Sequence, residues 1–356
     1  MSFQDLARAV QNGIDGKSNG IPMGFDRLNR YIGIRKSMYT LVGGLTGSGK
    51  TSFIDDAYVL NPFDWSLSRE GKASGIKLKI VYRSMERSRT YKMAKWVSRK
   101  IFLDHGTIIP VPKLLGWQKE KMTHDEHDLF LTYEDYIGEM GECITIIDGP
   151  DNPVGIAKQL KEVAQSQGKI IEDTEYSRHY EPNDDTAITL VVIDHIGLLK
   201  TTKDHATKKA SIDKMSDELR YARDLYGFSP VVVSQFNRDI SNPIRIKNGD
   251  VEPQLEDFAD SSSTQNDADV VLALFDPMRY KVEDPSGYKL DKLKDEYGAK
   301  YFRSLRLIKN SYGEDDVRIG LGFLGQIGMF KELPRLKDMS DYDYESVVNK
   351  TYFLDK

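Results

Sequence analysis

The ten residues GGLTGSGKTS, Gly43 to Ser52, decide the fold of this chain. Residues 44–51 fit the pattern G-x-x-x-x-G-K-S/T in full, the apolar run MYTLVG stands directly before them, and a helix is expected to begin at Ser52. Glycines at these positions let the backbone N–H groups turn toward phosphate oxygens, and the start of the next helix adds a positive field. The alternative, a glycine-rich turn without a ligand, needs strand, motif and helix to coincide by chance. We therefore expect a nucleoside triphosphate site here.

The residues of this loop have distinct expected roles. Lys50 is expected to reach the β- and γ-phosphates, and Thr51 to place its hydroxyl on Mg²⁺. The complete set expected to contact the nucleotide is Gly44, Leu45, Thr46, Gly47, Ser48, Gly49, Lys50, Thr51 and Ser52.

Short apolar runs recur on both sides of the loop. Seven of them read as strands buried on both faces: MYTLVG, LKIVYRS, CITIID, TLVVID, PVVVSQ, VVLALF and LRLIKN. Helical stretches such as Ser211–Leu225 lie between several of them, which predicts an α/β fold with a mostly parallel central sheet. The later run DVRIGLGFLGQIGMF indicates antiparallel strands that close one edge.

The organisation predicted along the chain is a single decorated domain. Residues 1–19 are expected to form a helical arm and linker, residues 20–335 the ATPase domain, and residues 336–356 a C-terminal tail. Three polar segments are interpreted as insertions, at about residues 60–77, 104–141 and 169–186.

Composition narrows the class of protein. The chain has 356 residues, 39% of them hydrophobic and 29% charged, which is typical of a soluble globular protein. The net charge of -5 argues against a protein covered in positive charge but leaves room for a local basic groove. The single cysteine, Cys143, allows no intrachain disulfide, and no run approaches the roughly 18 apolar residues that span a bilayer. We expect a cytoplasmic protein without a membrane partner.

Three strand ends carry the polar groups that hydrolysis needs. Asp194 ends the run TLVVID and is the expected second group on the magnesium side, against the simpler interpretation of a loop cap. Glu86 follows IVYRSM and is a candidate base for the attacking water, although a surface ion pair fits nearly as well. Gln235, after Ser234, is a candidate contact for the γ-phosphate, or else satisfies the end of its strand.

The order of these motifs resembles the RecA-like motor domain of the DnaB-type replicative helicases, including the related phage primase-helicases. The resemblance covers about residues 20–333. It rests on IPMGFDRLNRYIG, GLTGSGKT, RSMER, VVIDHIGLL, VVVSQFNR, SSSTQNDADVVLALF and LRLIKNSYGEDDVRIGLGF, which occur in the order of that family.

The resemblance implies roles for residues of this chain. Glu86 corresponds to the catalytic glutamate, Asp194 and His195 to the Walker B aspartate and its histidine, and Gln235 to the γ-phosphate sensor. Lys309 matches the lysine that such proteins supply across a subunit interface, whereas Ser311 stands where they have an arginine. Loss of an arginine finger costs on the order of 10³–10⁵ in rate. Arg306 or Arg318 is then expected to replace it, or hydrolysis is weak.

The family also implies partners. Its members form hexameric rings that hydrolyse ATP with Mg²⁺ between subunits and pull single-stranded DNA through the centre. On that basis the loop after Gln235 and the segment after Asp194 are expected to face DNA, with solvated loops as the alternative. The candidate DNA contacts are Arg238, Arg245, Lys247, Lys203 and Lys208. The sequence carries no recognisable primase-binding domain, so a primase or loader is expected to be a separate chain.

Three functions stay open on the sequence alone. The first is an ATP-dependent DNA helicase or translocase. The second is a RecA- or clock-type ATPase that assembles without unwinding. The third is a catalytically weak ring protein that keeps nucleotide only for assembly, which Ser311 favours and Glu86 disfavours.

Overall fold

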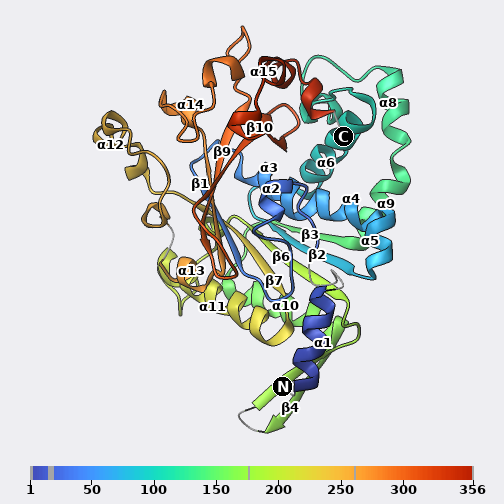
Figure 1. Cartoon of the computed structure of the whole chain (residues 1–356). Coiled ribbons are helices and arrows are strands. Elements are labelled where there is room, and N and C mark those ends of the chain that lie inside the picture. Colours follow the sequence, from blue (N-terminus) through green and yellow to red (C-terminus); the bar gives the residue numbers. More distant parts are fainter. Residues whose placement is uncertain (1–2, 15–19, 175–176, 260–261, 355–356) are drawn as a thin grey trace.

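A nine-stranded sheet forms the centre of the molecule, in the order β11-β10-β9-β8-β1-β7-β6-β2-β3 (Figure 1). The computed structural model describes residues 3–14, 20–174, 177–259 and 262–354. The strands of the large sheet are β1 Thr40–Gly44, β2 Lys77–Ser84, β3 Ile144–Asp148, β6 Ala187–Asp194, β7 Ser229–Gln235, β8 Val270–Phe275, β9 Phe302–Asn310, β10 Val317–Leu324 and β11 Met329–Glu332. A separate two-stranded sheet pairs β4 Gly168–Thr174 with β5 Ser177–Pro182.

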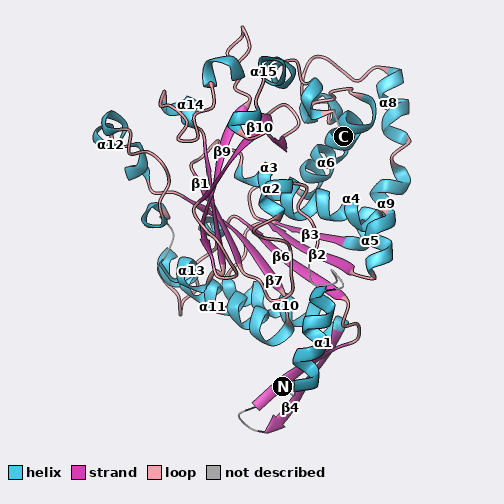
Figure 2. Ribbon diagram, in the orientation of Figure 1, coloured by secondary structure: helices cyan, strands magenta, loops and turns pink. Residues whose placement is uncertain are grey.

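Helices lie on both sides of this sheet (Figure 2). Their bounds are α1 Phe3–Ile14, α2 Asp26–Asn29, α3 Lys50–Ile54, α4 Asn61–Leu67, α5 Arg69–Ser74, α6 Arg89–His105, α7 Val111–Leu114, α8 His124–Leu131, α9 Glu134–Cys143, α10 Pro153–Gln167, α11 Lys208–Tyr226, α12 Pro243–Asn248, α13 Ser262–Asp267, α14 Pro277–Tyr280 and α15 Asp341–Val348. A π-helix, η1 Asp55–Leu60, joins α3 to α4.

The predicted α/β fold with a mostly parallel sheet is confirmed. Strands β8, β1, β7, β6, β2 and β3 pair in parallel, and β9, β10 and β11 continue the sheet in antiparallel fashion. All seven apolar runs form strands of this sheet. Both faces are covered, which explains why these strands are apolar throughout instead of alternating.

Alternate residues of one strand enter the two cores. Val231 and Val233 of β7 pack in the core beneath α3, α4 and α6, whereas Val232 packs in the core beneath α10 and α11. Helix α11 begins at the cap residue Thr207, whose side chain accepts from the backbone of Ala210, and ends at the left-handed Gly227. The period of two along the strand therefore divides the apolar residues between two helical layers.

The carboxyl ends of the parallel strands meet at one edge of the sheet. Gly44, the last residue of β1, pairs with Gln235 of β7, and Ser84 of β2 pairs with Asp194 of β6. Parallel strands bring the residues that follow them to the same edge, where open α/β sheets bind their ligands. The sheet thus gathers the polar strand ends that the sequence singled out.

The segments interpreted as insertions have regular structure. Residues 60–77 form the end of η1, then α4, α5 and the first residue of β2, and their Phe63 is buried in the core. Residues 104–141 hold α7, α8 and most of α9, whereas residues 169–186 hold most of the β4–β5 hairpin, which projects at the lower end of Figure 1. The polar composition of residues 60–77 did not indicate that part of this segment packs in the core.

The two terminal segments differ in how they pack. In α1, the apolar side chains of Phe3, Leu6, Val10 and Ile14 are exposed, while residues 15–19 of the predicted linker lie outside the described residues. The predicted tail instead folds back: the last part of the core includes Phe353 together with Tyr344 and Val347 of α15, packed with residues of β9–β11. None of the helices within the described ranges is long and apolar enough to cross a membrane.

Candidate nucleotide site

The phosphate loop turns tightly between β1 and α3. Gly47 and Gly49 have φ angles of 81° and 100°, which lie in the left-handed region that favours glycine. A Cβ atom on Gly49 would come within 2.9 Å of Phe330 Cζ. Glycine is therefore required at position 49 both by the backbone angle and by the ring of Phe330 packed against it.

The polar groups of the loop fit a phosphate ligand. Lys50 Nζ donates to the carbonyl oxygens of Gly44 at 2.8 Å and Leu45 at 3.0 Å, so the ammonium is held within the loop. The hydroxyl of Ser48 is buried, and no group in the described part of the chain forms a hydrogen bond with it. A buried polar atom of this kind is normally satisfied, and a phosphate oxygen would satisfy it. The loop thus has the donors that a nucleotide needs.

Thr51 and Asp194 form the magnesium side of the predicted site. Thr51 Oγ1 donates to Asp194 Oδ1 at 2.9 Å. Burial alone would raise the pKa of Asp194, but the ammonium of Lys92 and hydrogen bonds from Lys92, Tyr82 and Thr51 outweigh it, so this pKa is lowered. The carboxylate is therefore ionised at neutral pH. In the described ranges no cluster of three or more His, Cys, Asp or Glu side chains could hold a metal, and Mg²⁺ bound with a nucleotide commonly takes only one or two protein ligands.

A cavity of about 370 Å³ joins the loop to the other strand ends. Glu86 lines it with half of its side chain exposed, and the nearest cation is Arg87, 3.9 Å away. Gln235 Nε2 donates to His195 Nε2 at 3.2 Å, which links the end of β7 to the residue after β6. The complete lining is Thr46, Gly47, Gly49, Lys50, Thr51, Ser52, Glu86, Arg87, Tyr91, Lys92, Lys95, His195, Val233 and Gln235. The roles assigned to these residues stay predictions, but their gathering is observed.

Lys309 lies apart from this group. It pairs with Val271 near the start of β8, whereas Gly44 before the phosphate loop pairs with Leu274 near its end. Its Nζ donates to the carbonyl of Gln265 at 3.1 Å, at the end of α13. Lys309 therefore points to the opposite edge of the sheet from the phosphate loop of its own chain.

The arginines considered as replacements at Ser311 are both paired within the chain. Arg306 Nη2 lies 2.7 Å from Asp316, and Arg318 Nη2 donates to Glu252 at 2.9 Å. The backbone N–H of Ser311 itself donates to Asp269 at 2.9 Å. Either arginine would have to leave its carboxylate to act on a phosphate.

Two of the candidate DNA contacts lie on the loop that carries α12, which extends from the body at the upper left of Figure 1. Arg245 Nη2 donates to Asp257 at 3.2 Å, so its guanidinium holds the loop together. Lys247 is exposed. The side chain of Arg238, the third candidate on this loop, lies outside the described residues.

The other two candidate contacts follow β6. Lys203 is exposed, and Lys208 at the start of α11 donates to the carbonyl of Leu199. The two lysines therefore differ in whether they are available to bind DNA. Lys208 already forms a hydrogen bond with the segment after β6, whereas the side chain of Lys203 extends into solvent.

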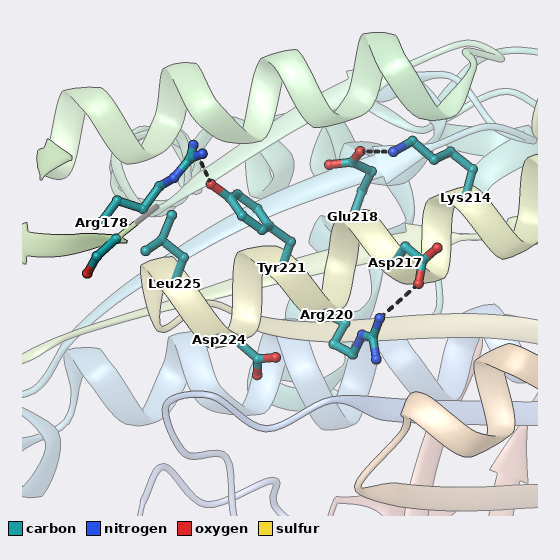
Figure 3. A pocket seen from close by; sticks show the side chains of 9 residues that line it. Arg178, Lys214, Asp217, Glu218, Arg220, Tyr221, Asp224 and Leu225 are labelled. Atoms are coloured by element: carbon teal, nitrogen blue, oxygen red, sulfur yellow. Dashed lines mark hydrogen bonds and ion pairs between the residues drawn. The ribbon is translucent and has the colours of Figure 1, made fainter. Parts of the chain in front are cut away.

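A larger hollow elsewhere lacks this chemistry. It has a volume of about 800 Å³ and lies between α11 and the start of β5 (Figure 3). Its charged groups pair with neighbours on the same surface: Arg178 donates to Tyr221 at 3.3 Å, and Lys214 lies 2.6 Å from Glu218. Charges satisfied in this way leave no convergent set for a phosphate. We therefore assign the nucleotide to the smaller cavity at the strand ends.

Several residues of the site were not predicted. Lys92 and Asp55 are buried beside Asp194, and Arg303 Nε donates to the carbonyl of Ser48 at 2.9 Å. The two consecutive aspartates inside the apolar run TSFIDDAYVL were a usable signal, because buried carboxylates need a partner. Arg303 gave no such signal, since it reaches the loop only through the pairing of β9 with β8.

These features define a P-loop nucleotide-binding protein of the RecA-like class. The sequence model of the DnaB-like helicase C terminal domain matches residues 20–332, and the chain belongs to that family. Among curated relatives, "Replicative DNA helicase DnaB" of Mycobacterium leprae (strain TN) is 29% identical over 106 residues, and that of Mycobacterium intracellulare is 28% identical over 104 residues. These matches cover 30% and 29% of this chain, and 17% of each relative.

Solved structures support the same fold. One of them, described as an "ATPase Domain", superposes with a TM-score of 0.67 at 18% identity, covering 94% of this chain and 99% of that chain. "The Structure Of A DnaB-Like Replicative Helicase And Its Interactions With Primase" superposes with a TM-score of 0.64 at 19% identity, covering 93% of this chain and 66% of that one.

Proposed function

We propose that this protein is an ATP-driven motor of the DnaB type that moves along single-stranded DNA in replication as a homo-oligomeric ring, expected to be hexameric. The observation that carries the proposal is the cavity in which the phosphate loop, Glu86 and the linked pair His195–Gln235 converge beside Thr51–Asp194. Membership of the DnaB-like helicase family supports the direction of this inference.

The residues of the cavity suit hydrolysis of a phosphoanhydride. A bound magnesium–ATP supplies the bond to be cleaved and a Lewis acid on its phosphates. Lys50 would exchange its two loop carbonyls for phosphate oxygens, and Thr51 and Asp194 would hold the metal side. Glu86 is exposed enough to meet water, from which it accepts a proton. Gln235, hydrogen-bonded to His195, carries the state of the site to the loop that follows β7.

Completion of the site requires a second subunit in this proposal. Lys309 lies at the opposite edge of the sheet from Lys50, so it serves the phosphate loop of a neighbour in the ring. The exposed apolar side of α1 supports assembly as well, since it offers surface for a second copy of the chain. Single-stranded DNA binds at the α12 loop and the segment after β6, mainly through Lys247 and Lys203. A separate primase or loader is a further expected partner, and the description of one structural neighbour names its interactions with primase.

ATP hydrolysis by the purified chain, with and without single-stranded DNA, tests the proposal. We expect stimulation by DNA in the wild type, loss of turnover in Lys50→Ala, and loss of turnover with retained nucleotide binding in Glu86→Gln. Loss of a general base costs on the order of 10²–10⁴ in rate. Glu162→Gln, an exposed carboxylate on α10, is the matched control. Undiminished turnover in Glu86→Gln would show that another group activates the water.

A second candidate is a ring protein that keeps nucleotide only for assembly. Ser311 and the internal pairing of Arg306 and Arg318 favour it, because no arginine is ready to act across an interface in the described part of this hairpin. Tight nucleotide binding with a rate near zero, unchanged by DNA, would support this candidate over the motor.

A further inference from the structure

Lys92 is a buried cation in the core beside the nucleotide site. It lies on α6 with 1% of its side chain exposed. Its Nζ lies 3.0 Å from Asp55 Oδ1 and 3.0 Å from Asp194 Oδ2, and it also donates to the phenol of Tyr82. An ammonium in such a place loses its hydration and persists only with excellent partners. The two carboxylates and the phenol provide them.

The two carboxylate oxygens of Asp194 have different partners. Oδ2 accepts from Tyr82 at 2.8 Å and from Lys92 at 3.0 Å, both buried donors. Oδ1 accepts from Thr51, the other residue on the magnesium side. Two donors on one oxygen fix the rotation of the carboxylate, so the other oxygen keeps facing Thr51.

The same lysine ties two helices to that carboxylate. Helix α6 begins at the cap residue Ser88, two residues after Glu86, and Lys92 occupies its first turns. Asp55 begins the π-helix that continues from the phosphate-loop helix. Because Lys92 bridges Asp55 and Asp194, the helix after Glu86, the helix after the phosphate loop and the end of β6 share one buried contact.

We propose that Lys92 is a positioning residue for the magnesium side of the nucleotide site. It holds Asp194 with Oδ1 toward Thr51 and sets the spacing of α6 from the phosphate-loop helix. This inference rests on the proposed function in one respect, that the site binds nucleotide with Mg²⁺. The competing interpretation is a core ion pair that stabilises the fold and has no bearing on the metal.

The test compares Lys92→Met with Arg99→Met. Arg99 is a matched control because it is a buried cation on the same helix, paired with Asp56 of the same π-helix, and it does not contact Asp194. Binding of a fluorescent N-methylanthraniloyl ATP is titrated in EDTA and at increasing MgCl₂. Thermal unfolding of each variant reports the loss of stability separately.

We expect Lys92→Met to need on the order of 10–100-fold more Mg²⁺ than the wild type for half-maximal tightening of probe binding, as for other residues that orient metal ligands. Arg99→Met should lower the unfolding temperature without moving the Mg²⁺ midpoint. Equal midpoints in the two variants would overturn the inference. A lower Mg²⁺ requirement in Lys92→Met would overturn it too, since the ammonium would then compete with the metal.

A second variant keeps the inference testable if Lys92→Met does not fold. Lys92→Met leaves Asp55 buried without its closest cation, so Asp55→Asn with Lys92→Met removes both charges together. The double variant should show the same Mg²⁺ shift. If the wild-type protein binds no probe in EDTA or in MgCl₂, the proposed function itself fails. If it binds and the variants match it, only the role of Lys92 fails.

Discussion

Replacing Lys309 by alanine tests whether each site is completed by a neighbour. Lys309 lies near the start of β8, while Lys50 follows β1 at the opposite edge of the sheet. In its own chain the ammonium contacts only carbonyl oxygens at the end of α13 among the contacts described. Loss of one charge-stabilising donor costs on the order of 10²–10³ in rate. Both Lys309→Ala and Lys50→Ala should therefore be nearly inactive alone.

Mixing the two variants should restore activity. A complete site in a mixed ring needs a Lys309→Ala subunit, which keeps Lys50, beside a Lys50→Ala subunit, which keeps Lys309. In an equal mixture each condition is met in half of the cases, so about a quarter of the sites are complete in a closed ring of identical interfaces. If sites turn over independently, the ATPase rate should rise to about that fraction of the wild-type rate.

The assay is the ATPase rate against mixing ratio, with the subunits combined as dissociated protein before assembly. The rate should peak at equal amounts and vanish at both ends. Energy transfer between wild-type subunits that carry different fluorescent labels shows independently whether subunits exchange. A flat baseline across all ratios, with exchange demonstrated, would refute the placement of Lys309 in a neighbour's site. Wild-type turnover in Lys309→Ala alone would refute any role for it.

Three further results are expected. Gly49→Ala should lose nucleotide binding in the same titration and lower the unfolding free energy by about 1–2 kcal/mol, because its left-handed angle and the ring of Phe330 both exclude a Cβ. Burial raises the pKa of Cys143 to about 11 from 9.0, so the thiol stays protonated at pH 8, and a disulfide reagent should react on the order of 100-fold more slowly with folded than with urea-unfolded protein; equal rates would contradict this. Lys247→Ala should reduce the salt dependence of single-stranded DNA binding by about one counterion, measured by fluorescence anisotropy, whereas Arg245→Ala should first destabilise its loop.

Much of the fold was predictable because its strands are buried on both faces. The runs around Val231 and Val191 are apolar at every position, a pattern that marks a parallel core without reference to tertiary contacts. The phosphate loop was predictable for a similar reason, since its chemistry lies in consecutive residues. The hairpin of β4 and β5 was not predicted, because its strands are polar and mostly exposed.

The rest of the site depends on contacts between distant segments. Lys92 is an ordinary helix residue until α6 packs beside Asp55 and Asp194, and only the fold makes it a buried ion. Arg245 was predicted to contact DNA from its place in the loop after Gln235, and this stays a prediction; its hydrogen bond to Asp257, twelve residues away, was not predicted. Charge in a sequence shows that a partner is needed but does not identify that partner.

The central sheet connects the two parts of this chain that act, in the proposed mechanism, on two different nucleotides. One edge carries the phosphate loop, and the far end of β9 carries Lys309. Protein cores are close-packed and resist compression, so the sheet is expected to tilt as one rigid body and not to bend. If the end of the sheet at the phosphate loop moved when its nucleotide is cleaved, the opposite end with Lys309 would move the other way. Lys309 would then shift at the nucleotide bound by the next subunit in the ring. The order of hydrolysis among subunits would in that case depend on the backbone of the sheet. Substitutions of exposed side chains on the sheet and its helices would leave that order largely unchanged.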